Sequence, residues 1–457
     1  MKSNRSLAIS TKIQEQKRDN IIGVLENEFP EEILSNPAYS AKRERIFTPA
    51  TTLLTMVLTS SQKDKTLKNS VDLYYGIHQR NRKEILLGLQ EENQKEEEEQ
   101  KNRGKRKVGR PKNNVLQIQK SKDNDISLNT AAYSKARARL PIELTIELFN
   151  KSLIENPSNT YSHWHGHRVF IADGTYVQMQ DTPELRKEYN VFHEGKQSPG
   201  YPQGLIEAIV ERATGQVYSF SLSNRHISEL SLFYDLIDTL PSGCILLVDD
   251  LYNCYEIMAK CLKKNIEIVV PAKRERNYET KKIISNGDEI IEIKVPKTRS
   301  KWLKQQENIP DTIELRKITC QSPDGNDYIL HTTVVEEEIS KDEIQTLFLT
   351  RWDIEISIRE IKTIMDINIF RSKTPEMVLK ELTVALATYN LIRKMIYASI
   401  KDLLFFPEED FIYKFYTLNT DIFIDKKRRV YKRWSTGRKR IGRINKEGNL
   451  TKERTRT

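Results

Sequence analysis

The sequence predicts an α/β protein, in which a mixed β-sheet with flanking helices follows a helical N-terminal region and is interrupted by a β-rich insertion. One indication is a pair of short apolar runs typical of buried strands, RVFIAD at 168–173 and CILLVDD at 244–250. Another is the amphipathic segment CYEIMAKCLKKN at 254–265, which follows the second run. Strands that alternate with such helices are typical of sheets with crossover connections.

Composition indicates a soluble globular protein. Of the 457 residues, 38% are hydrophobic and 30% are charged, and no apolar run approaches the roughly 18 residues that a membrane span needs. The N-terminus has no continuous apolar core like that of a secretory signal, so a cytoplasmic location is expected. The four cysteines form no CxxC pair, which argues against a zinc ribbon and against a disulfide framework.

The N-terminal region is expected to be helical. In FTPATTLLTMVLTSS, Thr48 is a plausible N-cap and Pro49 stands at the first helical position. A low-complexity charged stretch follows, and the segment AAYSKARARLP then returns to helix. Within the charged stretch, VGRPKNN resembles an AT-hook, which would insert Arg110 into an A·T-rich minor groove. The alternative is an exposed linker without a partner.

The central part continues with further strands. GLIEAIVERATGQVYSFSLS predicts two strands around an Ala-Thr-Gly turn, ISELSLFYDLIDTL predicts a helix, and IEIVVPA predicts another strand. Three charged β segments then make up the insertion: EIIEIKVP, TIELRKITC and YILHTTVV. With its length the chain has room for two to four domains. We expect a helical N-terminal region (1–89), a charged linker (90–126), a helical connection (127–167), the first part of the core (168–271), the β-rich insertion (272–340), a second helical part (341–420) and a basic tail (421–457).

The stretch FLTRWDIEISIREIK predicts one continuous helix with two stripes. At about 100° per residue, the first stripe holds Phe348, Arg351, Glu355 and Lys362. The second stripe is apolar and is the face expected to be buried, with Leu347, Ile354, Ile358, Ile361 and Met365. Asp353 and Glu360 are expected to point to water. Glu355 would lie at the edge of the buried face between two cations, where a carboxylate must be paired or bind a metal.

Two further carboxylates are candidates for chemistry. Asp173 and Asp249 each stand at the expected end of a buried strand, the edge where open α/β sheets bind ligands. With Glu355 they make a set of three acids whose oxygen ligands favour Mg²⁺ or Mn²⁺ over zinc. Two such ions about 3.5–4 Å apart can activate water at a phosphodiester. Taken alone, each Asp is more commonly a strand-end or turn residue.

Positive charge is concentrated in the tail. Residues 426–457 carry fourteen Lys or Arg and two Glu, against a net charge of +10 for the whole chain. Such a segment suits a polyphosphate, and Tyr431 or Trp434 could stack on a base. A solvated tail without a defined partner is the alternative.

Histidines offer weaker signals. HWHGHR places His163, His165 and His167 at a spacing of two, but three adjacent ligands lack a fourth, so a solvated or phosphate-facing loop is expected. His226 is expected to cap a helix or lie on the surface.

The order Asp-Gly-Thr at 173–175, Asp-x-x-aromatic at 249–252, and then Phe348, Arg351, Glu355 and Lys362 resembles the DDE transposases of bacterial insertion sequences. The closest group is the family numbered four, with its Tyr-Arg-Glu-Lys signature, over roughly residues 40–400. Phe348 stands where that family usually has tyrosine. Asp250 and Leu251 replace the usual basic residue and glycine after the second Asp.

The resemblance implies a ribonuclease H-like fold and a metal-dependent enzyme that cleaves and joins DNA. Asp173, Asp249 and Glu355 would bind two Mg²⁺ ions, or Mn²⁺. Arg351 and Lys362 would hold DNA phosphates, and Phe348 would lie with them at the DNA. Trp302, in RSKWLKQ, would hold a flipped base, with packing as the alternative. The partners would be double-stranded DNA, as terminal inverted repeats and target, and a second copy of the chain, near the bacterial nucleoid. A DNA-binding protein without cleavage activity, or a nuclease of the same fold, stays an alternative.

Overall fold

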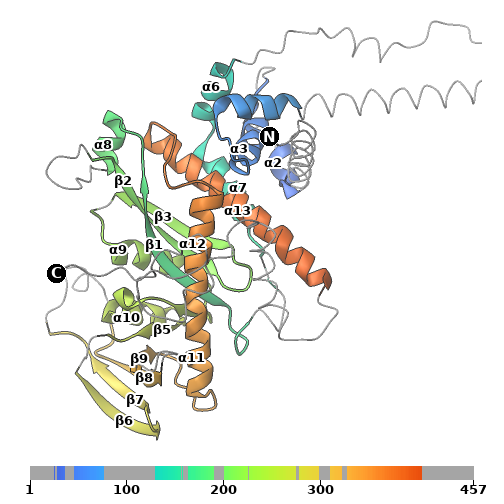
Figure 1. Ribbon diagram of the computed structural model, residues 1–457. Coiled ribbons are helices and arrows are strands. Elements are labelled where there is room, and N and C mark those ends of the chain that lie inside the picture. The colour runs from blue at the N-terminus through green and yellow to red at the C-terminus, as the bar shows by residue number, and fades with distance from the viewer. Residues whose placement is uncertain are drawn as a thin grey trace, which may run out of the picture. The chain divides into compact units, whose positions relative to one another are not determined.

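The computed structural model (Figure 1) describes the residues 25, 28–35, 46–76, 129–155, 157, 163–189, 200–224, 226–273, 277–297, 309–321 and 327–403. These residues form two compact units. The first unit takes in Met1–Leu240 and Trp352–Ala398, and the second Pro241–Arg351 and Ser399–Thr457. No helix in the described part is long and apolar enough to cross a membrane.

Helices open the first unit, as the sequence predicts. They are α2 (Glu31–Ser35), α3 (Pro49–Ser60), a helical stretch at 67–76, α6 (Ala131–Arg139) and α7 (Ile142–Ser152). The predicted N-cap is confirmed, because the Thr48 hydroxyl accepts a hydrogen bond from the Thr51 N–H at 3.2 Å. The Phe47 ring lies 4.6 Å from the ring of Tyr74 and 5.1 Å from that of Tyr133. This aromatic cluster packs residues 46–76 and 129–152 into one body, the N-terminal helical bundle.

Three strands of the first unit form an antiparallel meander. They are β1 (Val169–Gln178), β2 (Gln203–Glu211) and β3 (Val217–Asn224), in the order β3-β2-β1. The connecting and following helices are α8 (Pro183–Tyr189), α9 (Glu229–Leu236) and the 3₁₀ turn η2 (Ile237–Thr239). α9 packs on β2 and β3. The predicted hairpin is thereby confirmed, with Gly215 at φ +67° in its turn, a conformation that glycine adopts freely.

Two helices complete the first unit, α12 (Asp353–Ile364) and α13 (Pro375–Leu403). α12 lies against β1 (Figure 1). The link between the two helices returns to the same strand: the Gln178 N–H donates to the Asn368 carbonyl at 2.9 Å, and the Phe370 N–H donates to the Gln178 carbonyl at 3.0 Å. On α13, the buried Asn390 amide exchanges two 2.9 Å hydrogen bonds with the backbone of Val217. The meander is therefore fixed to both helices.

A mixed sheet forms the second unit. Its strands run in the order β4-β5-β9-β8-β7-β6, with β4 and β5 parallel and the other pairs antiparallel. Their bounds are β4 (Ile245–Leu247), β5 (Glu267–Pro271), β6 (Tyr278–Ser285), β7 (Asp288–Lys294), β8 (Thr312–Gln321) and β9 (Asp327–Thr332). The helical elements are η3 (Asp250–Tyr252), α10 (Tyr255–Lys263), α11 (Lys341–Leu349) and the turn η5 (Thr350–Trp352).

The strands and helices expected for the core and the insertion are confirmed, as is the mixed α/β class. β9 pairs with β5, so the strands of the expected insertion continue the sheet that β4 and β5 begin. The seven segment boundaries expected from the sequence stay a prediction.

Candidate active site

Asp173 lies on β1, but not at its end. The strand runs five residues beyond it, and Asp173 is paired in register with Ala208 of β2. The expectation that the strand ends at this aspartate is wrong, because Asp-Gly resembles a turn locally while the pairing with β2 extends the strand through both residues. The side chain is half-buried, and its Oδ1 accepts the Gly174 N–H at 2.9 Å.

Lys362 of α12 lies within electrostatic range of Asp173. Burial lowers the pKa of the Lys362 ammonium, and the negative charge of Asp173 acts in the opposite direction. The packing of α12 on β1 explains this proximity. The structure thus brings together a predicted metal ligand and a predicted phosphate contact.

Glu355 projects from the first turn of the same helix and is half-buried. It precedes Lys362 by seven residues, so both lie on one face of α12, about 10 Å apart along its axis. Within the described residues, its carboxylate makes no hydrogen bond or ion pair, so it is not held between two cations as the sequence predicts. The apolar side chains expected to be buried are mostly so: Leu347 of α11 and Ile354, Ile361 and Met365 of α12 and its C-cap are each at most 5% exposed, and Ile358 is half-buried.

Asp353 and Glu360 do not point to water, contrary to the sequence prediction. Burial raises the pKa of both carboxyl groups. Arg212 faces Asp353, whereas Glu360 faces Arg393 and accepts a 3.3 Å hydrogen bond from the Tyr389 hydroxyl. The helix therefore has a second inward face, which one amphipathic stripe does not reveal.

The stretch 348–362 is not one continuous helix either. α11 ends at Leu349, and the 3₁₀ turn η5 separates it from α12. Phe348 and Arg351 are 7% and 8% exposed, and the Arg351 guanidinium lies 5.7 Å from the centre of the Phe348 ring. A ring without a hydroxyl supports this cation–π contact, so the phenylalanine can keep a packing role at this position. The DNA contacts of both residues stay a prediction.

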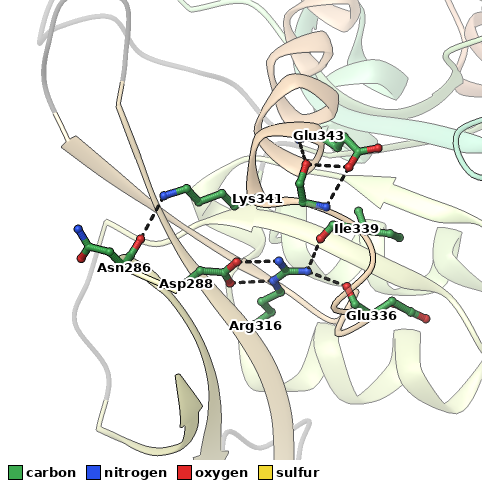
Figure 2. A network of polar contacts seen from close by, with 8 residues as sticks. Asn286, Asp288, Arg316, Glu336, Ile339, Lys341 and Glu343 are labelled. Carbon is green, nitrogen blue, oxygen red and sulfur yellow. Dashed lines mark hydrogen bonds and ion pairs between the residues drawn. The ribbon is translucent and has the colours of Figure 1, made fainter. Parts of the chain in front are cut away.

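A buried arginine fixes the start of α11 (Figure 2). Arg316 of β8 is 1% exposed and holds both Asp288 carboxylate oxygens, at 2.8 and 2.7 Å. Its Nη1 also donates to the carbonyls of Glu336 and Ile339, each at 2.8 Å. The helix then begins with a capping box between Ser340 and Glu343. This network anchors the helix that leads to Phe348 and Arg351.

Asp249 stands two residues beyond β4, as the N-cap of η3. Its carbonyl accepts the Tyr252 N–H at 3.0 Å, while its half-buried carboxylate accepts no hydrogen bond from any described residue. The neighbouring Asp250 differs, because its Oδ1 accepts the Lys273 N–H at 2.9 Å. Within the described residues, Asp249 therefore keeps both carboxylate oxygens available to a ligand, whereas one oxygen of Asp250 is engaged by the backbone.

Two glutamates near Asp173 escape the sequence patterns. Glu207 pairs in register with Gly174 and is fully buried. A Cβ on Gly174 would lie 2.6 Å from the Glu229 carboxyl group and 2.9 Å from Glu207 Oε2, so both acids crowd the residue after Asp173. The only local signal is a glutamate inside the apolar strand GLIEAIVE.

The remaining candidates carry no site in the described residues. HWHGHR forms a tight turn in which Trp164 and His167 exchange two 2.9 Å backbone hydrogen bonds, so its histidines do not line one strand face. His226 is exposed, as expected.

No group of three or more His, Cys, Asp or Glu in the described ranges is arranged to hold a metal. Asp173 and Glu355 belong to the first unit and Asp249 to the second, and their role as one ligand set stays a prediction. Arg110, Trp302, the charged linker and the basic tail lie outside the described residues.

Comparisons with known proteins agree with the family resemblance of the sequence. Residues 164–391, which include all three acids and the Phe348–Lys362 stretch, match the family described as "Transposase DDE domain". The chain is 25% identical over 270 residues to the transposase InsG for insertion sequence element IS4 of Escherichia coli (strain K12), across 58% of this chain and 60% of that relative.

A solved structure is also similar, the piggyBac transposase synaptic complex with hairpin DNA. The likeness covers 62% of this chain and 60% of that one, at 10% identity and a TM-score of 0.34, a value too low to carry an argument. By the domain match, residues 164–391 belong to the transposase DDE domain family, and the curated relative that 58% of the chain resembles is a transposase of insertion sequence element IS4.

Proposed function

We propose that the protein is the DNA transposase of an insertion sequence, which cleaves DNA at the ends of its element and joins the freed 3′ ends to target DNA. The observation that carries this proposal is the match to a transposase DDE domain over a segment that holds Asp173, Asp249 and Glu355 in order. The core is proposed to be ribonuclease H-like. The mixed sheet and its helices are compatible with that fold.

Divalent metal ions fit the donor set. Asp173, Asp249 and Glu355 are half-buried carboxylates, and those of Asp249 and Glu355 are not engaged by any described residue. Oxygen ligands of this kind suit Mg²⁺, with Mn²⁺ as a substitute, and we propose that the three acids hold two ions. When bound, such ions lower the pKa of a water and neutralise charge on a phosphodiester.

The chain's own cations would orient the DNA. Lys362, beside Asp173, is placed to contact a phosphate next to the metal ligands, and partial burial strengthens its electrostatic effect. Arg351 is proposed to contact a second phosphate, with Phe348 supporting its guanidinium. Trp302 is proposed to hold a flipped base and Arg110 to enter a minor groove.

The proposed partners are double-stranded DNA, as terminal inverted repeats and as target, and a second copy of the chain in a synaptic homodimer. The N-terminal helical bundle and the basic tail would grip the repeats. The proposed location is the bacterial cytoplasm at the nucleoid. The chain spans 60% of the length of the curated relative. These properties of the whole protein are therefore part of the proposal.

The test is cleavage of a labelled duplex that carries the terminal repeat of the source element, with Mg²⁺ or Mn²⁺. We compare wild type with Glu355→Gln, which keeps the side-chain size and removes the charge, and measure binding in parallel. Glu184→Gln, at an exposed position of α8, is the matched control. Glu355→Gln should bind normally and cleave at least 100-fold more slowly, about the loss that follows removal of one group that stabilises transition-state charge.

The outcomes separate the alternatives. Binding without cleavage by wild type with either metal would favour a DNA-binding protein that lacks activity. Cleavage without joining, when the protein is given a pre-cut 3′ end, would favour a nuclease. Equal cleavage by Glu355→Gln and wild type would remove Glu355 from the site.

A further inference from the structure

A lysine of the N-terminal helical bundle reaches the helix that carries Glu355. Lys65 lies in the turn between α3 and the helix at 67–76, and its ammonium donates a hydrogen bond to the carbonyl of Met365. Met365 is the C-cap of α12. The last carbonyls of a helix lack partners within it and carry partial negative charge, so an ammonium at this point stabilises the end of α12.

The turn that presents Lys65 is itself fixed by short hydrogen bonds. Asp64 Oδ1 accepts the Thr66 N–H at 2.9 Å, and the Asp64 carbonyl accepts the Asn69 amide at 2.6 Å. The Thr66 hydroxyl caps the next helix through the Asn69 N–H at 3.2 Å. Thr59 of α3 then bonds Ser70 at 3.0 Å and joins the two helices. Lys65 therefore extends from an ordered turn of the bundle.

The segment after α12, which accepts the hydrogen bond from Lys65, is also fixed by hydrogen bonds. Asn368 donates its side-chain amide to the Lys362 carbonyl at 3.2 Å, and its own carbonyl accepts the Gln178 N–H at 2.9 Å. The segment after α12 thus joins the helix of Glu355 and Lys362 to the strand of Asp173. Lys65 acts on that segment at its first residue, Met365.

The surroundings of Lys65 support a lasting contact. Burial lowers its pKa to about 8, and the charges of Asp366 and Glu381 oppose this shift while Arg371 adds to it. The ammonium is thus largely charged at neutral pH although the side chain is half-buried. A buried cation needs hydrogen-bond acceptors, and the Met365 carbonyl provides one.

A second lysine makes the reverse connection. Lys380 of α13 is fully buried, pairs with Glu376 at 2.5 Å, and donates to the Ala138 carbonyl in the last turn of α6 at 3.2 Å. Each side of the boundary between the N-terminal helical bundle and the α12–α13 helices therefore supplies a lysine that caps a helix of the other side. The Lys65 contact fixes the bundle to the end of α12, and the Lys380 contact fixes it to α13; the residues joined are 300 and 242 positions apart in sequence.

We propose that Lys65 is a positioning residue that holds the C-terminal end of α12, and with it Lys362 and Glu355, in place relative to the N-terminal helical bundle. If the proposed function holds, DNA gripped by the bundle is thereby placed in register with Asp173, Glu355 and Lys362 of the same unit. Lys65 itself is not proposed to touch the reacting atoms.

The test is hydrogen exchange, measured on the full chain without DNA, for a peptide that covers residues 361–372. Lys65→Met removes the ammonium, Lys65→Arg keeps a cation that can donate to the carbonyl, and Lys187→Met, at an exposed position of α8, is the matched control. We expect exchange about tenfold faster in Lys65→Met, since a hydrogen bond from a charged donor is lost. The Lys65→Arg and Lys187→Met proteins should stay near wild type. A circular dichroism spectrum of each variant reports whether it is folded.

Equal exchange in Lys65→Met and Lys187→Met would overturn the proposal, as would a Lys65→Arg protein that exchanges as fast as Lys65→Met. If the Lys65→Met protein is unfolded, the Lys65→Arg protein is compared with wild type. Faster exchange in Lys65→Arg than in wild type would then count against the proposal. The same variants are then given repeat DNA at saturating concentration. A slower single-turnover cleavage by Lys65→Met, with unchanged affinity, supports a positioning role. If wild type itself neither binds nor cuts the repeat, the proposed function fails, while the exchange result still decides the role of Lys65.

Discussion

The buried pair of Arg316 and Asp288 allows a quantitative prediction. Replacing Arg316 by Met removes four hydrogen bonds of 2.7–2.8 Å, while the Asp288 carboxylate is left at 3% exposure. Loss of one partner from a buried ion pair destabilises by about 3–5 kcal/mol. The carbonyls of Glu336 and Ile339 also lose their donor, at about 1–3 kcal/mol each where water does not replace it. We therefore expect a loss of at least about 3 kcal/mol.

A double mutant separates these contributions. Asp288→Leu combined with Arg316→Met removes the orphaned charge but leaves the two carbonyls without a donor, so it should be more stable than Arg316→Met alone. Lys281→Met, which removes an exposed lysine of β6 and its ion pairs with Glu279 and Glu292, is the control and should stay near wild type.

The assay is hydrogen exchange of the β7 and β8 amides in increasing urea, which reports the stability of the second unit. The reasoning is refuted if Arg316→Met lies within about 1 kcal/mol of wild type, below the range for breaking a buried pair. It is also refuted if the double mutant is less stable than Arg316→Met, because the penalty would then not come from the unpaired carboxylate.

Two further substitutions test the first unit. Gly174→Ala would place a methyl group 2.6 Å from the Glu229 carboxyl. It should lower the melting temperature by several degrees, since overpacking costs about 1–3 kcal/mol. Gly76→Ala, with open space around it, should leave the melting temperature unchanged, and equal melting temperatures of the two variants would contradict the crowding at Gly174. Burial raises the pKa of Glu360, so its charged form opposes folding above its unfolded pKa. Glu360→Gln should raise the melting temperature at pH 7, and the gain should fade as the pH is lowered to about 4. A lower melting temperature at pH 7 would instead mean that the charge stabilises the protein through Arg393 or Tyr389.

The sequence predicts the elements well because their signals are local. The N-cap at Thr48 and the strands around Asp173 and Asp249 depend on residues next to one another in the chain. The apolar stripe of α12 is also a local pattern, and so is the Asp-x-x-aromatic spacing from Asp249 to Tyr252. The hydrogen bond between the Asp250 carboxylate and the backbone of Lys273 is one that no local pattern contains, and the role of Asp249 stays a prediction.

Contacts between distant parts of the chain account for what was missed. The burial of Asp353 and Glu360 depends on Arg212 and Arg393, which approach α12 from other elements. The break at η5 contains neither glycine nor proline, so no residue in it predicts the end of α11. The helix caps by Lys65 and Lys380 join residues that are 300 and 242 positions apart in the chain. No periodic pattern in the sequence predicts such contacts.

The pairing of β5 with β9 decides which strands lie at the outer border of the sheet in the second unit. The chain leaves the sheet after β5 and returns beside it as β9, so β6, β7 and β8 lie progressively farther from that pair. The outermost strand, β6, is exposed along nearly its whole length and carries Lys281 and Lys282, charges that discourage pairing with other chains. Removal of β6 would therefore leave the hydrogen bonds of the β5–β9 pair in place.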